Sequence, residues 1–464
     1  MSASLAADDI RIVITDLDQD GSGVGGTGRH HRSEPGPEPE LGPALEVHVP
    51  GALPGDEVAA HIVHRAAGRP VAWARLRAIL RASPDRVAPS CRAQGACGGC
   101  VLQPYTYRAQ LAWKAAALRR EIERAPALHD VAVEPVVPSP AMLGYRNNSK
   151  LVAGHDGSGR LVLGAYAPRT HDIVDLAGCA VVEPPLVDAA AVLRGILEAH
   201  AVSPYDERSL TGCLRYVVLR ANARGEVLAT LVTATASFRG GDAVAAELRA
   251  RCPHVLGVVA NVNPTTGNAL YGGVERTLSG SPTLADEIGT VRLRISSRAF
   301  FQANRAVAGL AYDAIARAAS LTGSERVVDA YAGVGGIALT LAARALSVVG
   351  IEEHASAVAD ANASAALNRV TNARFVAGDV AKELERIEAA DVVVLNPPRK
   401  GCADSVLERA AQLGARSIVY LSCAPQSLMR DLARLRELGY RTTRLQPFDM
   451  LPHTPHLEVL AILS

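Results

Sequence analysis

A short glycine-rich segment in the last third of the chain constrains the fold more than any other feature. Apolar residues 326–328 precede it, residues 329–336 read Asp-Ala-Tyr-Ala-Gly-Val-Gly-Gly, and a helical pattern follows at 337–342. A strand that turns tightly into a helix brings backbone N–H groups and small residues close to a cofactor. The Gly-x-Gly-Gly spacing lacks the spread glycines of a dinucleotide fingerprint, so we do not expect an NAD site.

Apolar runs alternate with helical patterns through the rest of this third. The runs occupy residues 326–330, 347–351, 373–377, 391–395, 417–421 and 457–463. This alternation is typical of an α/β domain with a doubly wound parallel sheet. Because ligands bind at the carboxyl ends of the strands in such sheets, polar residues that follow a run are candidates for the site.

The 464 residues are too many for one typical core and predict about two to four domains. Short apolar segments near residues 10–17, 45–49 and 57–63 alternate with a glycine-rich turn at 21–28 and a Pro-rich loop at 30–43. This pattern predicts a small β-barrel over residues 8–70. We expect a mixed α+β central domain over 71–298, with a strand at 72–80 and a helix at 107–124, and the α/β domain over 299–464.

Charge is uneven along the chain although the net charge is only +1. Residues 65–124 contain 12 Lys or Arg and 3 Asp or Glu, a local excess of +9. Such a stretch is either a phosphate-binding surface or a solvated basic face. No apolar stretch approaches the roughly 20 residues of a membrane span, and the first ten residues lack signal-peptide features, so we expect a cytoplasmic protein with no membrane partner.

Three of the eight cysteines, Cys91, Cys97 and Cys100, fall within ten residues. Because a cytoplasmic protein rarely holds disulfides, clustered thiols indicate a metal or an iron–sulfur cluster. A tetrahedral site needs a fourth ligand, and Cys179 is a candidate. The spacing alone does not exclude Cys213 or Cys252, and four thiolates suit either zinc or a [4Fe–4S] cluster.

Two acids follow apolar runs after the glycine turn. Glu352 ends a run about 20 residues downstream, where an acid can accept hydrogen bonds from the ribose hydroxyls of an adenosine cofactor. Asp379 ends the next run, at a place where an adenine would lie, although an exposed loop acid is an equal alternative there.

Two further polar groups follow later runs. Asn396 begins an Asn-Pro-Pro turn after one buried run, and Cys423 follows the run at 417–421. A thiol near a helix N-terminus at the carboxyl edge of a sheet is a candidate nucleophile, whereas a lone buried cysteine is usually inert. Together these features predict an S-adenosylmethionine methyltransferase with a nucleophilic cysteine.

With these motifs the chain resembles a known family, the RNA uracil-C5 methyltransferases. The stretches that carry the resemblance are residues 300–304 (Phe-Phe-Gln-Ala-Asn), 329–336, 396–401 (Asn-Pro-Pro-Arg-Lys-Gly), 422–425 (Ser-Cys-Ala-Pro) and 449–458, with 145–148 and 171–175 in the middle of the chain. Residues 49–56 also resemble the central turn of TRAM domains, which are small RNA-binding barrels.

The resemblance implies roles residue by residue. Cys423 matches the nucleophile and Glu458 the base. The residues expected to bind S-adenosylmethionine are Gln302, Tyr331, Gly333, Gly336, Glu352, Asp379 and Asn396. Cys91, Cys97, Cys100 and Cys179 match the [4Fe–4S] ligands of some members, which favours Cys179 over its competitors. The resemblance further implies an RNA partner, and we expect a monomer.

Two departures and three alternatives accompany this interpretation. Many members have Asp where this chain has Asn396, and many have Asn where it has Ala424. We expect 23S ribosomal RNA as the substrate, with transfer RNA as the nearer alternative. A catalytically degenerate RNA-binding protein is a second alternative, and a cytosine-C5 enzyme is disfavoured because Pro398, not a cysteine, occupies the place of its nucleophile.

Overall fold

The computed structural model describes residues 9–27, 45–267 and 269–464, which divide into two compact units. The first unit extends to Trp113 and also includes His453–Pro455. The second contains Lys114–Pro452 and His456–Ser464. The Pro-rich loop predicted at 30–43 lies outside the described residues, and the three-domain division expected from the sequence stays a prediction.

A six-stranded sheet forms most of the described part of the first unit, in the order β1-β5-β6-β4-β3-β2. Its strands are β1 (Asp9–Val13), β2 (Asp16–Leu17), β3 (Gly23–Gly26), β4 (Glu46–Val49), β5 (Glu57–Arg65) and β6 (Val71–Arg81). β4 pairs with β6 in parallel, and the other neighbours pair antiparallel. Alternate apolar side chains, such as Ile12, Val47 and Val58, form the core of this sheet.

The glycine-rich segment predicted as a turn at 21–28 is in part the strand β3. A Cβ added at Gly23 would lie 2.7 Å from the carbonyl oxygen of Ala52, and one at Gly25 would lie 2.4 Å from that of Val13. These glycines therefore allow a strand to pass close to neighbouring backbone. The sequence pattern of a turn and that of a crowded strand are the same here.

The central part of the second unit is a seven-stranded sheet in the order β10-β9-β8-β11-β12-β13-β14. Its strands are β8 (Asn148–His155), β9 (Leu161–Tyr166), β10 (Ile173–Asp175), β11 (Leu214–Ala221), β12 (Val227–Thr233), β13 (Val255–Val262) and β14 (Val274–Gly280). Helices α2 (Pro184–Ala199) and α3 (Gly241–Arg251) pack on it through one apolar core. The hairpin of β15 (Thr283–Ile288) and β16 (Val291–Ser296) follows.

The C-terminal part of the second unit is an eight-stranded sheet in the order β19-β18-β17-β20-β21-β23-β22-β7. Its strands are β7 (Ala132–Val133), β17 (Arg326–Ala330), β18 (Ser347–Glu352), β19 (Ala373–Ala377), β20 (Val392–Leu395), β21 (Ser417–Ser422), β22 (Thr442–Phe448) and β23 (Glu458–Leu463). The helices of this part are α4 (Arg305–Ala319), α5 (Gly336–Ala342), α6 (Ala355–Leu367), α7 (Val380–Glu385), α8 (Asp404–Gln412) and α9 (Pro425–Glu437).

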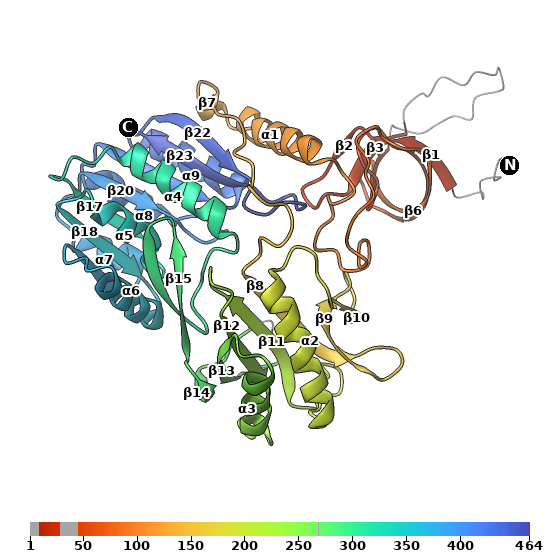
Figure 1. Ribbon diagram of the computed structural model, residues 1–464. Helices are drawn as coiled ribbons and strands as arrows, with labels where there is room; N and C mark the ends of the chain where they lie inside the picture. Colours follow the sequence, from red (N-terminus) through yellow and green to blue (C-terminus); the bar gives the residue numbers. More distant parts are fainter. Residues whose placement is uncertain (1–8, 28–44, 268) are drawn as a thin grey trace, which may run out of the picture. The chain divides into compact units, whose positions relative to one another are not determined.

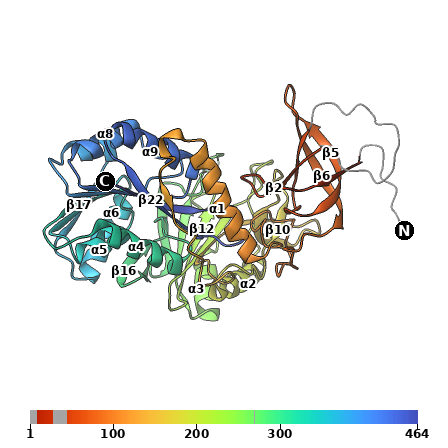
Figure 2. The ribbon, with the colours of Figure 1, turned by 90° about the horizontal axis from the view of Figure 1, so that it is seen from above.

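Helices cover both faces of this sheet, as expected for a doubly wound fold. α4 and α5 pack on one face, and α8 and α9 pack on the other (Figures 1 and 2). β17 to β21 are parallel, whereas β23 runs antiparallel to both of its neighbours. The six predicted runs match β17, β18, β19, β20, β21 and β23 to within a residue at either end, but β22 was not predicted.

Helix α1 (Tyr107–Glu123) matches the helix predicted at 107–124, and the short 3-10 helix η1 (Pro126–Leu128) follows it. The part of α1 that belongs to the second unit carries one partner of a buried ion pair. Lys114 Nζ donates to Asp449 Oδ1 at 2.5 Å, and neither side chain is exposed to solvent. A buried charge is tolerated only with a partner of this kind. The pair therefore ties α1 to the start of the segment that leads into β23. Among the described helices, none is both long and apolar enough to cross a bilayer.

Asp329 is a buried acid in β17, directly before the glycine turn. Its side chain is inaccessible to solvent, and neither carboxyl oxygen has a hydrogen-bond partner within the described chain. Burial raises the pKa of Asp329 to about 7, an effect that the Ala338 backbone offsets only in part and the Glu352 charge increases. The group is therefore close to half protonated at neutral pH.

Asp329 makes stability depend on pH in a defined direction. An acid whose folded-state pKa is raised stabilises the fold below its unfolded pKa of about 3.9 and loses this contribution as pH rises through about 7. Asp329→Asn cannot ionise, so at pH 8 it is expected to exceed wild type by on the order of 3 kcal/mol in unfolding free energy. At pH 5, which is already above the unfolded pKa, the excess should be about a third as large. Urea unfolding at both pH values measures this, with exposed Asp313→Asn as control; equal differences at both would contradict the prediction.

Candidate active site

The glycine turn, residues 331–335, lies where the chain changes direction across the sheet. The strand order places β17 between β18 and β20, so the connections from β17 and from β20 leave on opposite sides. Asn396 N, just after β20, donates to the carbonyl oxygen of Ala330 at 3.3 Å. Ligands of open α/β sheets bind at such a switch point.

The backbone of this turn needs left-handed conformations at three residues. Tyr331 has φ 68°, Gly333 has φ 55° and Gly335 has φ 87°. A Cβ at Gly333 would meet no atom within 4 Å, so space is open beside this residue. At Gly335 a Cβ would lie 2.8 Å from the Phe375 ring. The turn thus combines an open side with a packed side.

Gly336 is buried, and its Cα faces the ring of Tyr312 on α4, since an added Cβ would lie 2.8 Å from that ring. The packing of α4 against α5 is reason enough for a glycine here. Burial, followed by the charges of Asp329 and Glu458, raises the pKa of Tyr312. This tyrosine therefore lies near both acids.

Glu352 ends β18 and is bonded to the glycine turn. Its Oε2 accepts a hydrogen bond from Gly333 N at 3.0 Å, and its Oε1 accepts one from His354 N at 2.9 Å. Its side chain is 14% exposed, so the carboxylate still has lone pairs that face outward. An acid held in this way is suited to the hydroxyls of a ribose.

Asp379 has a structural role as well as a predicted one. The residue is exposed, and its Oδ1 caps α7 by accepting a hydrogen bond from Lys382 N at 3.1 Å. Gly378 N donates to the carbonyl oxygen of Glu352 at 3.0 Å, which brings the two acid-bearing loops side by side. Both interpretations of Asp379 are compatible with this position.

Gln302 lies in the loop before α4. Its carbonyl oxygen accepts a hydrogen bond from Asn147 Nδ2 at 2.8 Å, and its residue is 8% exposed. Asn304 caps α4, where its side chain accepts from Val307 N. By contrast, Phe300 is 70% exposed, which is unusual for a large apolar side chain. The sequence analysis did not single out Phe300, although it lies in one of the quoted motifs.

These residues fit the adenosyl part of S-adenosylmethionine. The turn offers open space at Gly333, and Glu352 offers a fixed carboxylate beside it. β17 and β18, which lead to the glycine turn and to Glu352, lie between β19 and β20 in the sheet. Asp379 follows β19, and Asn396 follows β20. The donors and acceptors present are those that an adenosine needs.

Cys423 and Glu458 interact at the same edge of the sheet. Cys423 follows β21 and lies two residues before Pro425, the first residue of α9. Glu458 is the first residue of β23, which neighbours β21 in the sheet. The Glu458 charge raises the pKa of the Cys423 thiol, and the Arg399 guanidinium lowers it. Arg399 also lies 3.4 Å from His456 Nε2. A thiol, a carboxyl and a cation therefore face one another.

Burial is the largest influence on both titrating groups. It raises the pKa of Cys423, and the attraction of Arg399 opposes this only partly. It also raises the pKa of Glu458 to about 7, with Arg399 again lowering it. A carboxyl with a pKa near 7 is suited to act as a general base at neutral pH.

Arg399 is a site residue that the sequence analysis did not assign. It lies inside the quoted Asn-Pro-Pro-Arg-Lys-Gly stretch, but it received no role. The signal available from sequence was a cation in a loop that follows a strand next to the one bearing the thiol. Neighbouring parallel strands end at one edge, so such a cation is within reach of the thiol.

Three of the predicted metal ligands belong to the first unit and the fourth, Cys179, to the second. Cys91 N donates to Gln103 Oε1 at 2.9 Å, and Cys97 N donates to Ala93 O at 3.0 Å, in a loop of successive turns that also holds Cys100. Within the described ranges, no three His, Cys, Asp or Glu side chains are grouped closely enough to hold a metal ion. The cluster therefore stays a prediction from the cysteine spacing.

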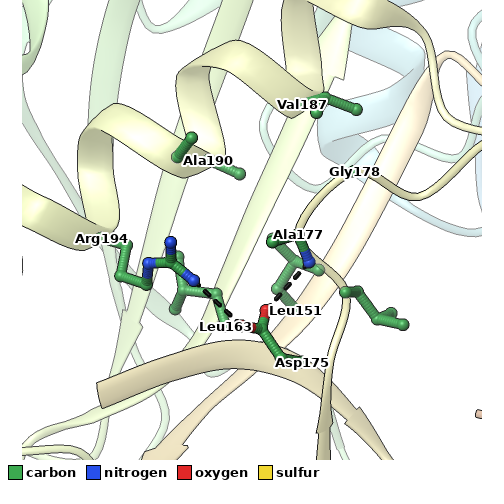
Figure 3. Close-up of a pocket in the computed structure, with 10 residues that line it drawn as sticks. Leu151, Leu163, Asp175, Ala177, Gly178, Val187, Ala190 and Arg194 are labelled. Carbon is green, nitrogen blue, oxygen red and sulfur yellow. Dashed lines mark hydrogen bonds and ion pairs between the residues drawn. The ribbon is translucent and has the colours of Figure 1, made fainter. Parts of the chain in front are cut away.

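Cys179 belongs to the second unit, next to a small cavity of about 20 Å³ (Figure 3). Asp175 lines this cavity; its Oδ1 accepts from Ala177 N at 2.9 Å, and its Oδ2 accepts from Arg194 Nη1 at 3.0 Å. Cys179 N then donates to Leu176 O at 3.1 Å. The ion pair therefore braces the turn that presents Cys179.

The competing cysteines are less suited to ligate a metal. Burial raises the thiol pKa of both Cys213 and Cys252, and Cys252 lies within the apolar core beneath α2 and α3. A metal ligand must be a thiolate, which such surroundings disfavour. Cys402, also buried, has its thiol pKa raised to about 12 by burial.

Comparison with known proteins gives a consistent result. The sequence profile of the tRNA (uracil-5-)-methyltransferase family matches residues 285–464. An uncharacterised RNA methyltransferase from Geobacter sulfurreducens is 40% identical over 99% of this chain and 91% of its own length. One from Bacillus cereus is 35% identical over 98% of this chain and 96% of its own length.

A solved structure covers almost the whole fold. The tRNA (uracil-54, C5)-methyltransferase of Pyrococcus abyssi, in complex with S-adenosyl-L-homocysteine, is similar with a TM-score of 0.77 and 27% identity, over 98% of this chain and 100% of that chain. The glycine turn and the cysteine–glutamate pair therefore lie in a protein related to methyltransferases along its length. The chain belongs to the RNA uracil-C5 methyltransferase family and is an S-adenosylmethionine-dependent RNA methyltransferase.

Proposed function

We propose that this enzyme methylates C5 of a uridine in ribosomal RNA through a transient covalent bond between Cys423 and C6 of the uracil. The observation that carries the proposal is the group of Cys423, Glu458 and Arg399 at the carboxyl edge of the sheet. Gln302, Tyr331, Gly333, Gly336, Glu352, Asp379 and Asn396 are proposed to bind the cofactor.

The chemistry explains why these groups are needed. Uracil C5 is a weak nucleophile, so the Cys423 thiolate first bonds to C6 and moves electron density to C5. When bound, S-adenosylmethionine would supply an electrophilic methyl group to C5, with S-adenosylhomocysteine as the leaving group. Glu458 then accepts the C5 proton, the C6–S bond breaks, and Cys423 is released. A positioned base of this kind contributes about 10²–10⁴-fold.

Arg399 acts on the first of these steps. Its cation favours the Cys423 thiolate, which burial disfavours. The exposed ring of Phe300, next to Gln302, offers a flat apolar surface for an unstacked base. A uridine in a loop, or one flipped out of a helix, is therefore the expected substrate.

Ribosomal RNA is the substrate we propose, and transfer RNA is the second candidate. The Pyrococcus relative, which acts on tRNA uracil-54, favours the second candidate. The basic stretch at 65–124, with 12 cations against 3 acids, is proposed to bind RNA phosphates. The TRAM-like character of residues 8–70, the monomeric state and the cytoplasmic location also remain predictions.

The central test replaces the nucleophile. Cys423→Ala should show no detectable methyl transfer to total RNA from cells that lack this enzyme, while Cys213→Ser should match wild type. Labelled S-adenosylmethionine and mass spectrometry of the digested RNA measure 5-methyluridine in the ribosomal and transfer fractions separately. Full activity of Cys423→Ala would refute the covalent mechanism, and product found in the transfer fraction alone would replace the ribosomal assignment.

The pKa of Glu458 predicts a pH profile. Because the base must be ionised, kcat/KM should gain an extra rise of about tenfold per pH unit below the Glu458 pKa of about 7, added to the rise from ionisation of the Cys423 thiol, whose pKa burial raises. Glu458→Gln should lose about 10²–10⁴-fold in kcat and lose this rise. Exposed Glu353→Gln is the control and should keep the wild-type profile. A Glu458→Gln enzyme with an unchanged profile would mean that another group is the base.

We also propose a [4Fe–4S] cluster on Cys91, Cys97, Cys100 and Cys179, supported by their spacing and by the raised thiol pKa values of Cys213 and Cys252. Protein purified without oxygen should contain about four iron and four sulfide per chain and absorb broadly in the visible range. Cys179→Ser should lower the iron content, whereas Cys252→Ser should not. Stoichiometric zinc without sulfide would overturn this proposal.

A further inference from the structure

The loop that carries Arg399, residues 396–402, is held mainly from helix α9. Arg430 Nη2 on α9 donates to Lys400 O at 2.9 Å and to Cys402 O at 3.4 Å. Ser427 Oγ donates to Arg399 O at 2.8 Å. The backbone from Arg399 to Cys402 is therefore bonded to one helix.

Asp431 is the centre of these contacts. It is 1% exposed and accepts four hydrogen bonds: two at Oδ1 from Arg430, at 2.8 and 2.6 Å, and two at Oδ2, from Cys402 N at 2.8 Å and Tyr420 Oη at 2.6 Å. All four partners donate, so only a carboxylate satisfies them together. A buried carboxylate with this many donors is fixed in place.

The loop also fits closely against this carboxylate. Gly401 has φ 80°, and a Cβ added there would lie 2.5 Å from Asp431 Oδ2. Glycine at this position therefore allows the backbone to approach the acid. Asp431 thus packs closely against the loop backbone as well as bonding to it, whereas a surface salt bridge with Arg430 alone would not need this close fit.

The same helix begins beside the nucleophile. Cys423 is followed by Ala424, which caps α9, and by Pro425, its first residue. Tyr420, which donates to Asp431, lies on β21 three residues before Cys423. Asp431 therefore bonds at once to the strand that presents the thiol and to the loop that presents the cation.

The Cys423 thiol follows β21, and the Arg399 cation follows β20. The distance between them is therefore fixed only if one group is bonded to both segments. We propose that Asp431 is a positioning residue that holds Arg399 at the Cys423 thiol by joining β21, α9 and the 396–402 loop. This inference rests on the proposed role of Cys423 as the nucleophile. Asp431 itself touches neither the thiol nor the base in this scheme and acts through Arg399.

The experiment measures the reactivity of the thiol without turnover. Asp431→Asn keeps the shape of the side chain but replaces one acceptor oxygen by a donor, which frees Cys402 N and Tyr420, or Arg430. If Arg399 then moves away, the thiol pKa should rise and alkylation of Cys423 by iodoacetamide at pH 8 should slow about tenfold. Peptide mass spectrometry resolves Cys423 from the other seven cysteines.

A double-mutant cycle separates positioning from a general loss of structure. In the Arg399→Gln background the support has no cation to hold, so Asp431→Asn should change the alkylation rate by less than about twofold. For methyl transfer, Asp431→Asn alone should lower kcat about 10- to 100-fold, since a misplacement of about 1 Å costs this much. Equal effects in both backgrounds would overturn the proposal.

Two further variants keep the test decisive. Glu437→Gln, at an exposed ion pair with Arg434 on the same helix, is the matched control and should leave the alkylation rate and kcat unchanged. If Asp431→Asn does not fold, Arg430→Gln removes the two bonds to the loop carbonyls from a side chain that is 58% exposed. It should shift both readouts in the same direction by a smaller factor, and wild-type values for both would refute the proposal. Activity of Cys423→Ala would instead overturn the nucleophile assignment itself.

Discussion

Parallel strands of one sheet end along one edge, and the candidate active site depends on this constraint. The glycine turn follows β17, Glu352 ends β18, Asn396 follows β20 and Cys423 follows β21. Glu458 joins the same edge from the opposite direction, because β23 is antiparallel to β21 and begins where β21 ends. One antiparallel strand thus brings the Glu458 carboxyl, near the end of the chain, to the edge that carries the Cys423 thiol.

Burial is the largest influence on the protonation of Cys423 and Glu458. It raises the pKa of Glu458 to about 7 and disfavours the thiolate of Cys423. Arg399 opposes both effects, so its position decides the balance between acid and thiol. Two buried polar groups hold the segments that carry these residues. The Asp431 carboxylate is bonded to the 396–402 loop, and the Lys114–Asp449 pair lies at the start of the segment that leads to Glu458.

Sequence patterns predicted some elements well and others poorly, for identifiable reasons. β17, β20 and β21 are apolar runs that are almost wholly buried, and they were located almost to the residue, as were β18 and the less buried edge strand β19. β22 contains Arg444, Gln446 and Pro447 and pairs with the two-residue β7 on its outer side, so its sequence resembles a polar loop. β3 consists largely of glycine and was interpreted as a turn. The periodicity of a strand is readable only where side chains pack against a core.

The sequence by itself determined the fold class, the order of the strands that carry the site and the family, because these depend on local apolar periodicity and on short motifs. It did not determine which charges meet. Arg399 acts by its charge on Cys423 and Glu458, and four donor atoms converge on Asp431, although most of these residues lie far apart in the sequence. The burial of Asp329 without a hydrogen-bond partner likewise depends on residues that are distant in the sequence. Only tertiary packing brings such residues together and removes the water between them, and the pKa values of buried groups depend on both.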